Sequence, residues 1–363
     1  MGNREGAARA LGAVEAETGA RWSPRWGRQG QLFERLWSSP VVPLGSWPTP
    51  IQRVTRAGQC DLLIKRDDLS GFGRGGAKAR KLTHLLGHLR SRGHGELLAV
   101  AGNVTNLAFD LCLASEISGI RTRLFIVDDP PAPAAERAKV FAGVANRVEL
   151  LQGGRTAAAA TVLRAYAAAW QAGRRPFLAL PGASHPACVI GNACGFLEMV
   201  AQLDAQGAPL PRAVFVTAAT GTTVAGLLLA ADALLAAGGP YIRVVGVQAY
   251  PGRIALRTLA LVRWTERFLT SRRPTPIGRA NFVLSRQEFA RFGATVPNLC
   301  SRVEQQLGIK IDPIFGGKTW EAMEADVMAN APGERPLLYW HCGYTPEWQT
   351  LRASVSTLRE VVA

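Results

Sequence analysis

The stretch KRDDLSGFGRGGAKARKL, residues 65–82, leads from an expected short strand at 62–64 through a glycine-rich loop into an expected helix at 77–89. Lys78 falls in the first turn of that helix, where its charge opposes the helix dipole, so stability alone does not favour it. A lysine near a helix N-terminus and other cations can have a lowered pKa, as an amine that attacks a carbonyl requires. Lys78 is therefore a candidate nucleophile, and the alternatives are Lys81 or a plain surface lysine.

The same loop matches the dinucleotide-binding spacing G-x-G-x-x-G at Gly71, Gly73 and Gly76. A lone match is weak evidence, because the fingerprint should follow the first strand directly. Here residues 66–70 intervene. The spacing therefore does not predict a dinucleotide site.

Short apolar runs alternate with helical stretches along the rest of the chain, which predicts an α/β fold of parallel sheets flanked by helices. Strands are expected at 97–100, 124–127, 148–151, 177–180, 213–216, 244–247 and 336–341, and helices at 107–117, 156–172, 223–237, 297–307 and 319–328.

Two more loops follow expected strands and end at a helix N-terminus, at 102–106 and 218–223. Ligands of open α/β sheets bind beyond the carboxyl ends of the strands. The second loop contains Thr220, Gly221, Thr222 and Thr223. Small residues let backbone N–H groups approach a phosphate, and the helix offers its positive end. An ordinary helix cap explains the same residues equally well.

Composition excludes several classes of protein. The net charge is +15, but the excess arginine is spread along the whole chain without a nucleic-acid-binding motif. The six cysteines form no C-x-x-C pair, and His84 and His88 lack a third ligand, so neither a disulfide framework nor a metal site is expected. We expect a cytoplasmic protein, because the chain shows no secretory signal and its apolar runs fall short of the ~20 residues that span a bilayer.

Taken together, the motifs resemble those of the 1-aminocyclopropane-1-carboxylate (ACC) deaminase and D-cysteine desulfhydrase family. Residues 65–68 and 75–82 resemble the family signature K-R-E-D … G-G-N-K-x-R-K-L-E. Five further segments follow in the family's order: 102–106 (G-I-Q-S-N), 181–186 (the segment that closes the smaller lobe), 219–226 (T-G-S-T-x-A-G), 312–318 (D-P-V-Y-E/T-G-K) and 341–343 (H-x-G-G).

The resemblance implies the two-lobed fold type II of pyridoxal 5′-phosphate (PLP) enzymes, which is like that of tryptophan synthase β. It implies an N-terminal arm at 1–47, a large PLP-binding domain at 48–92 and 190–363, and a small α/β domain at 93–189. It also implies PLP as the cofactor, a small amino acid as the substrate and a homodimer as the assembly. The charge distribution and the short apolar runs described above give no reason to expect nucleic acid or a membrane as partners.

Carried over residue by residue, the resemblance makes Lys78 the lysine that binds PLP covalently and moves the Cα proton of the substrate. Lys81 and the loop Thr220, Gly221, Thr222 and Thr223 would hold the cofactor phosphate. Asn106 would hydrogen-bond the phenolic oxygen of the ring, and Thr105 stands where the family has a serine near the substrate carboxylate.

Several pocket positions depart from the family pattern. Phe315 and Phe292 replace tyrosines, and Tyr344 replaces a glycine. Gly316 stands where the family has Glu or Thr facing the pyridine nitrogen of the cofactor, and Cys342 is a candidate to replace that contact. These changes remove groups that steer protons, so we expect weak activity on ACC and on D-cysteine.

Two functions remain after this comparison. The first is a PLP-dependent lyase or deaminase that carries out α,β-elimination, deamination or β-replacement on a small amino acid. The alternative is a PLP-binding relative with little or no catalysis, in a regulatory or scaffold role. Retention of Lys78 and Asn106 favours the first, and the altered pocket favours the second.

Overall fold

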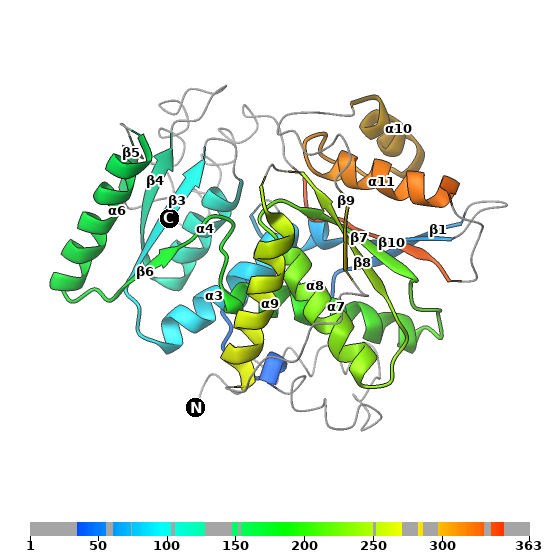
Figure 1. Cartoon of the computed structure of the whole chain (residues 1–363), viewed down its shortest axis with the longest axis horizontal. Coiled ribbons are helices and arrows are strands. Elements are labelled where there is room, and N and C mark those ends of the chain that lie inside the picture. Colours follow the sequence, from blue (N-terminus) through cyan, green and yellow to red (C-terminus); the bar gives the residue numbers. More distant parts are fainter. Residues whose placement is uncertain are drawn as a thin grey trace. The chain divides into compact units, whose positions relative to one another are not determined.

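The computed structural model describes residues 35–55, 61–73, 75–102, 106–127, 147–151, 154–249, 252–270, 282–285, 297–329 and 335–344 (Figure 1). The chain divides into two compact units. The first comprises residues 1–84 and 184–344, and the second comprises residues 85–183 and 345–363.

A six-stranded sheet forms the centre of the first unit, in the order β1-β2-β10-β7-β8-β9. Its strands are β1 (Ile51–Val54), β2 (Leu62–Lys65), β7 (Ala213–Ala218), β8 (Arg243–Gln248), β9 (Phe282–Ser285) and β10 (Leu337–Trp340). Only the outer pair β1–β2 is antiparallel among these described strands, and the other pairs are parallel.

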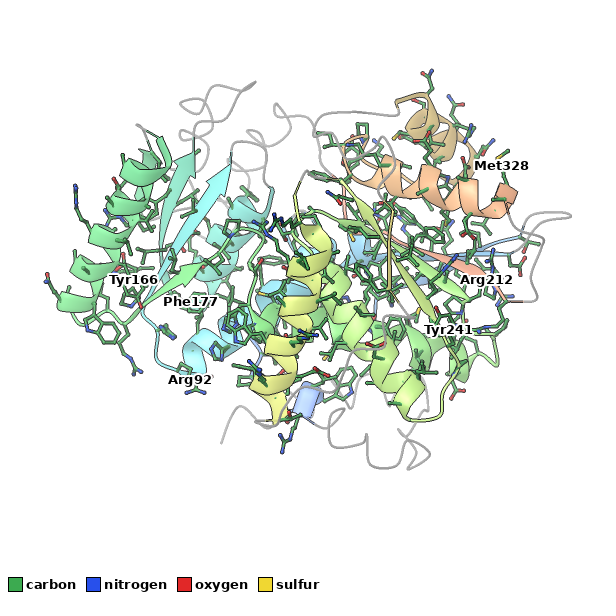
Figure 2. All side chains as sticks on the ribbon, viewed as in Figure 1. Arg92, Tyr166, Phe177, Arg212, Tyr241 and Met328 are labelled. Carbon is green, nitrogen blue, oxygen red and sulfur yellow. The ribbon has the colours of Figure 1, made fainter. Side chains whose placement is uncertain are left out.

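Side chains of the central strand β7 alternate between two cores, as the period of two along a strand requires. Val214 and Val216 belong to the core formed with helices α7 (Pro186–Ala205), α8 (Thr222–Ala236) and α9 (Ile254–Thr270). Ala213 and Phe215 belong to the core on the other face, formed with α10 (Pro297–Leu307) and α11 (Gly316–Ala329). Helices therefore cover both faces of this sheet. Figure 2 shows the side chains that fill these layers, with the exposed Met328 near the end of α11.

Helices α7 and α8 are in close contact because glycine lies between them. A Cβ on Gly226 of α8 would lie 2.5 Å from the Cβ of Asn192 on α7. Helix α7 is long and apolar enough to cross a membrane, but 94% of its apolar window is buried inside the structure, as in a core helix.

The second unit contains a parallel four-stranded sheet in the order β5-β4-β3-β6. Its elements are β3 (Glu96–Gly102), β4 (Arg121–Val127), β5 (Arg147–Leu151), β6 (Pro176–Ala179), α4 (Asn106–Ser118) and α6 (Gly154–Gln171). Leu98, Phe125 and Val162 belong to its core. Helix α3 (Ala77–Ser91) begins in the first unit and ends in this one.

The predicted α/β class with largely parallel sheets is confirmed. Helices α7 and α9 were not predicted as helices from the sequence. In α7 nearly every side chain is buried, and a helix buried on all sides lacks the polar face that gives a periodic pattern. The edge strands β1 and β9 were also missed, and each has only four residues.

Candidate active site

The glycine-rich loop before α3 lies against the loop that follows β10. The N–H of Gly76 donates to the carbonyl of Asp67 at 2.6 Å, and Gly76 has a φ of 84°. A Cβ on Gly76 would lie 1.9 Å from the carbonyl oxygen of Cys342. Only glycine permits this approach of two backbones. The segment that carries Lys78 and the segment that carries Cys342, far apart in sequence, therefore meet.

Lys78 lies in the first turn of α3 and is partly buried. Its charge acts on two groups from other elements, because it lowers the pKa of the Asp312 carboxyl and of the Cys342 thiol against the raising effect of burial. Groups from two other family-like motifs therefore lie within electrostatic range of this lysine.

Lys81 is buried one turn after Lys78 on α3. Burial lowers the pKa of its ammonium group to about 8, and the groups that oppose this shift are the thiols of Cys342 and Cys188. Among the described residues no carboxylate forms an ion pair with Lys81. A buried cation without a protein anion is a site at which an anionic ligand is stabilised.

Gly221 is the N-cap residue of helix α8, has a φ of 88° and makes no side-chain cap hydrogen bond. Thr222 and Thr223 are buried in its first turn, and the Oγ atom of Ser184 lies 3.4 Å from Thr222 Oγ1. A helix start without a carboxylate or hydroxyl cap retains backbone N–H groups for an anion. Thr220, by contrast, is partly exposed in the loop before the helix.

Helix α11 in the same unit has its own carboxylate cap. Asp312 accepts hydrogen bonds from the N–H groups of Ile314, Phe315 and Gly316 at 3.0, 2.7 and 3.0 Å. Burial raises the pKa of this carboxyl, while the N–H groups of Gly316 and Phe315 and the charge of Lys78 lower it. This start of a helix needs no external anion, in contrast to that of α8.

Gly316 packs against a buried phenol. A Cβ at this position would lie 2.9 Å from Tyr339 Oη and 3.3 Å from Asp312 Oδ2. The Tyr339 hydroxyl donates to the Gly316 carbonyl at 3.2 Å, and its ring packs edge-on against Trp320. Tyr339 therefore lies where a larger side chain at position 316 would extend, which the sequence did not indicate.

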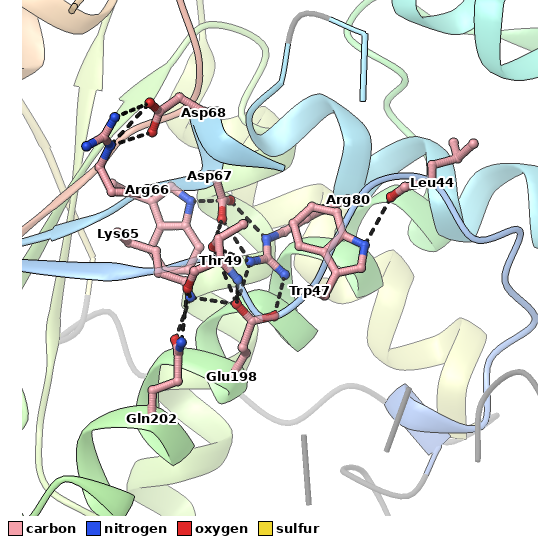
Figure 3. A network of polar contacts seen from close by, with 11 residues as sticks. Leu44, Trp47, Thr49, Lys65, Arg66, Asp67, Asp68, Arg80, Glu198 and Gln202 are labelled. Atoms are coloured by element: carbon pink, nitrogen blue, oxygen red, sulfur yellow. Dashed lines mark hydrogen bonds and ion pairs between the residues drawn. The ribbon is translucent and has the colours of Figure 1, made fainter. Parts of the chain in front are cut away.

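A buried ionic network, not predicted from the sequence, holds the start of α3 in place (Figure 3). Arg80 donates to both carboxylate oxygens of Asp67, at 2.8 and 2.9 Å, and to both of Glu198, at 2.8 and 3.0 Å. Lys65 Nζ lies 2.6 Å from Glu198 Oε1. The positive charges of Arg80 and Lys65 thus equal the negative charges of Asp67 and Glu198 within the core.

Neutral groups complete this network. The hydroxyl of Thr49 and the indole N–H of Trp340 each donate to Asp67 at 2.8 Å, and Gln202 lies 2.6 Å from Lys65 Nζ. The ring of Trp47 lies 4.1 Å from the Arg80 guanidinium carbon. Because Arg80 is two residues from Lys78, these contacts fix the turn that carries the candidate nucleophile.

The pKa values in this network follow from its charges. Burial alone would raise the pKa of Glu198, but Arg80 and Lys65 outweigh burial and lower it to about 2. Burial lowers the pKa of Lys65 despite Glu198, and Asp67 and Glu198 raise the pKa of Arg80 despite burial. Glu198 therefore remains ionised at all ordinary pH values.

Other candidate residues are not brought to this site by the described coordinates. Thr105 and Phe292 lie outside the described residues. Asn106 is the first residue of α4 in the second unit, and its side chain is not among those described. Tyr344 follows the Cys342 segment and is partly buried. Within the described ranges no cluster of His, Cys, Asp or Glu could hold a metal ion.

The residues present fit PLP. Its phosphate dianion matches an uncapped helix start and a buried ammonium group without a carboxylate, and its aldehyde requires a primary amine such as that of Lys78. All these groups lie in the first unit of the chain.

Comparisons with known proteins agree with this assignment. A 1-aminocyclopropane-1-carboxylate deaminase of Burkholderia vietnamiensis is 29% identical over 336 residues, covering 85% of this chain and 95% of the relative. The nocardicin C-9′ epimerase of Nocardia uniformis is 27% identical over 328 residues, covering 85% and 94%. The crystal structure of an ACC deaminase homologue superimposes with a TM-score of 0.71 at 24% identity, covering 86% of this chain and 94% of that chain.

The model of one protein family, described as pyridoxal-phosphate dependent enzyme, matches residues 42–343. This range includes the loop before α3, the start of α8, the cap of α11 and the segment after β10. The chain therefore belongs to the family of pyridoxal-phosphate dependent enzymes.

Proposed function

We propose that this enzyme uses PLP, bound to Lys78, to carry out α,β-elimination, deamination or β-replacement on a small amino acid. The proposal rests on two features of the unit that also presents Lys78. The start of α8 at Gly221 has no side-chain cap, and Lys81 is buried without a carboxylate partner among the described residues. This arrangement suits a phosphorylated aldehyde better than any uncharged ligand.

The residues of the chain have separate tasks in this proposal. The N–H groups at the start of α8 and the Lys81 ammonium bind the phosphate. The network of Arg80, Asp67 and Glu198 orients the first turn of α3, so that the Lys78 amine has a fixed position. Lys78 Nζ would hold the cofactor and, with a substrate bound, would accept the Cα proton and return it.

When bound, PLP supplies an electron sink that makes the Cα–H bond of an amino acid acidic. The protein determines which bond is broken next through the groups around the substrate. Lys78 and Lys81 lie three residues apart on one helix, and each has one task in this proposal. Lys78 binds the cofactor covalently, and Lys81 binds its phosphate.

The alternative of a PLP-binding relative without turnover has a specific observation in its favour. Gly316 and Phe315 lack the carboxyl or hydroxyl groups of the family pattern, and Asp312 is committed to capping α11. Few proton-handling side chains therefore remain near Lys78 among the described residues.

Absorbance spectroscopy and product analysis distinguish the two functions. Purified, PLP-loaded protein should show a visible band from the lysine-bound cofactor, and a substrate amino acid should change this band and release ammonia, a keto acid or the β-substituent. A band that responds to no amino acid, with no product, supports the non-catalytic alternative. The absence of PLP binding would contradict the proposal. We also propose that the protein is cytoplasmic and forms a homodimer. Sedimentation tests the dimer, because the mass of one chain is 38.9 kDa.

A further inference from the structure

Two threonine hydroxyls meet at the carboxyl end of β7. Thr217 lies one residue before the end of the strand and is partly exposed, whereas Thr319 on α11 is fully buried. Their Oγ1 atoms are 2.7 Å apart. The Thr319 hydroxyl donates to the Phe315 carbonyl at 3.3 Å, so this carbonyl orders the pair.

Thr217 lies among the segments that form the site. β10 pairs with β7 as far as Tyr339 opposite Phe215, so Thr217 lies beyond this ladder. Its backbone instead lies near the Cys342 thiol and lowers the pKa of that thiol, against the raising effect of burial. The Thr217 hydroxyl also lies 3.5 Å from the carbonyl of Phe315, the residue before Gly316.

The other polar groups around Gly316 are committed. The Tyr339 hydroxyl is buried and donates to the Gly316 carbonyl, and the Asp312 carboxylate accepts three backbone N–H groups. Burial raises the pKa of the Cys342 thiol to about 12, so it is neutral and a weak hydrogen-bonding group. The Thr217 hydroxyl is partly exposed and retains hydrogen-bonding capacity beyond Thr319.

We propose that the Thr217 hydroxyl, positioned by Thr319, contacts the pyridine nitrogen of PLP and supplies the polar contact that Gly316 cannot make. This inference rests on the proposed function. The pyridine nitrogen lies across the ring from the carbon that Lys78 binds. A hydroxyl pair suits either protonation state of that nitrogen. While Thr319 donates to the Phe315 carbonyl, Thr217 donates to Thr319 and accepts from a protonated nitrogen. When the Thr319 hydroxyl turns away from that carbonyl to donate to Thr217, Thr217 donates to an unprotonated nitrogen.

The test compares PLP with its 1-deaza analogue, in which carbon replaces the ring nitrogen. The wild-type protein should bind PLP about three- to tenfold more tightly than the analogue, as one net hydrogen bond allows. In Thr217→Val the affinity for PLP should fall to that for the analogue, so that the ratio approaches one. Valine keeps the β-branched shape of threonine and its preference for a strand.

Matched variants separate the possible partners of the nitrogen. Thr217→Ser should keep the wild-type ratio, Thr319→Val should reduce it in part, and Cys342→Ala should leave it unchanged. A wild-type ratio of one, an unchanged ratio in Thr217→Val, or a collapse in Cys342→Ala instead would overturn the proposal. If Thr217→Val does not fold, Thr217→Ala and Thr319→Val provide the same comparison.

The same experiment separates this inference from the proposed function. If the wild-type protein binds neither compound through Lys78, the proposed function fails as well. If both compounds bind through Lys78 and the ratio does not respond to Thr217→Val, only the assignment of Thr217 is wrong.

Discussion

We assign different tasks to two lysines one turn apart, Lys78 and Lys81, because only Lys81 is buried. We expect Lys78→Ala to abolish the visible band of the covalently bound cofactor. Lys81→Ala should keep this band but weaken PLP binding about 10- to 100-fold, which is the range for a charged hydrogen bond. Absorbance spectra and equilibrium dialysis measure the two effects.

Pyridoxal without its phosphate is the control for this pair of variants. Lys81→Ala should bind pyridoxal as well as the wild-type protein does, because the missing ammonium group has no phosphate to meet. If the band survives Lys78→Ala and disappears in Lys81→Ala, the tasks of the two lysines are reversed.

Gly221 combines a left-handed backbone with a close neighbour. A Cβ there would lie 2.5 Å from the Thr258 hydroxyl, which is itself bonded to the Ile254 carbonyl. Gly221→Ala should therefore lower the free energy of unfolding by about 1–2 kcal/mol and weaken PLP binding. From the sequence we expected a side chain here to meet the phosphate, and the structure adds a collision within the protein.

Two further variants separate strain from ligand binding at Gly221. Gly238 lies at the other end of α8 with a φ of 85° and no atom near its Cβ position, so Gly238→Ala should be strained without affecting PLP. In Gly221→Ala/Thr258→Ala the stability should recover in part while PLP affinity stays low. Recovery of affinity together with stability would argue against phosphate binding at this loop. Urea unfolding and PLP titration give both quantities.

Sequence motifs predicted most of these residues but not their partners. Gly221 and Lys81 were chosen by resemblance, whereas Thr217, Tyr339 and Glu198 belong to elements that were unremarkable or missed in the sequence. Glu198 lies on α7, whose mainly apolar sequence has no continuous polar face and gave no sign of a helix. Contacts between residues distant in the chain, such as Gly76 with Cys342, depend on packing that a single sequence does not encode locally.

At the scale of elements, the network around Arg80 links the start of α3 to β2, α7 and β10. Removing one partner of a buried ion pair leaves an uncompensated charge and costs about 3–5 kcal/mol. A hydrophobic substitute could pack the same volume, so the ionic form is better explained by the fixed geometry it gives to α3 than by stability.

Glu198→Gln should reduce the free energy of unfolding by about 3–5 kcal/mol at neutral pH, and this difference should depend on pH. The folded pKa of Glu198, about 2, is lower than its ordinary value of 4.5. A depressed carboxyl pKa contributes stability above the unfolded value, and this contribution is lost as pH falls through the folded value. The difference between the wild-type protein and Glu198→Gln should therefore shrink between about pH 4.5 and 2.

An exposed ion pair provides the control for this element. Glu304 Oε1 lies 3.6 Å from Lys310 Nζ, and at least half of each side chain is exposed. Glu304→Gln should change the free energy of unfolding by less than about 1 kcal/mol at any pH. Urea unfolding at a series of pH values measures both variants, and an equal effect of the two would show that the network contributes no special stability.

At the scale of the whole molecule, the sheet order of the first unit gathers motifs that the sequence spreads over most of its length. Parallel strands β10, β7 and β8 end at one edge, so the loops after β7 and β10 become neighbours. The alternation of strands and helices predicted this edge as the ligand site. It could not predict which residues lie beside the positions that depart from the family pattern, such as Thr217 beside Phe315.

We expect the activity of the whole protein to depend on those departures. Phe315 precedes the first residue of α11 and is partly buried, and it carries no hydroxyl where the resembled family has tyrosine. A group that meets developing charge on a proton-transfer path is often worth 10²-fold or more in rate. We therefore expect weak turnover of ACC and of D-cysteine by the PLP-loaded protein, and a gain of about tenfold or more for at least one of them in Phe315→Tyr. The measurement is kcat/KM with each substrate.

Phe177→Tyr on β6, whose ring packs edge-on with His94 in the second unit, adds the same hydroxyl outside the site and should change neither value. Efficient turnover by the unmodified protein would show that the hydroxyl is dispensable. An equal response of Phe315→Tyr and Phe177→Tyr would show that its loss does not explain the weak activity.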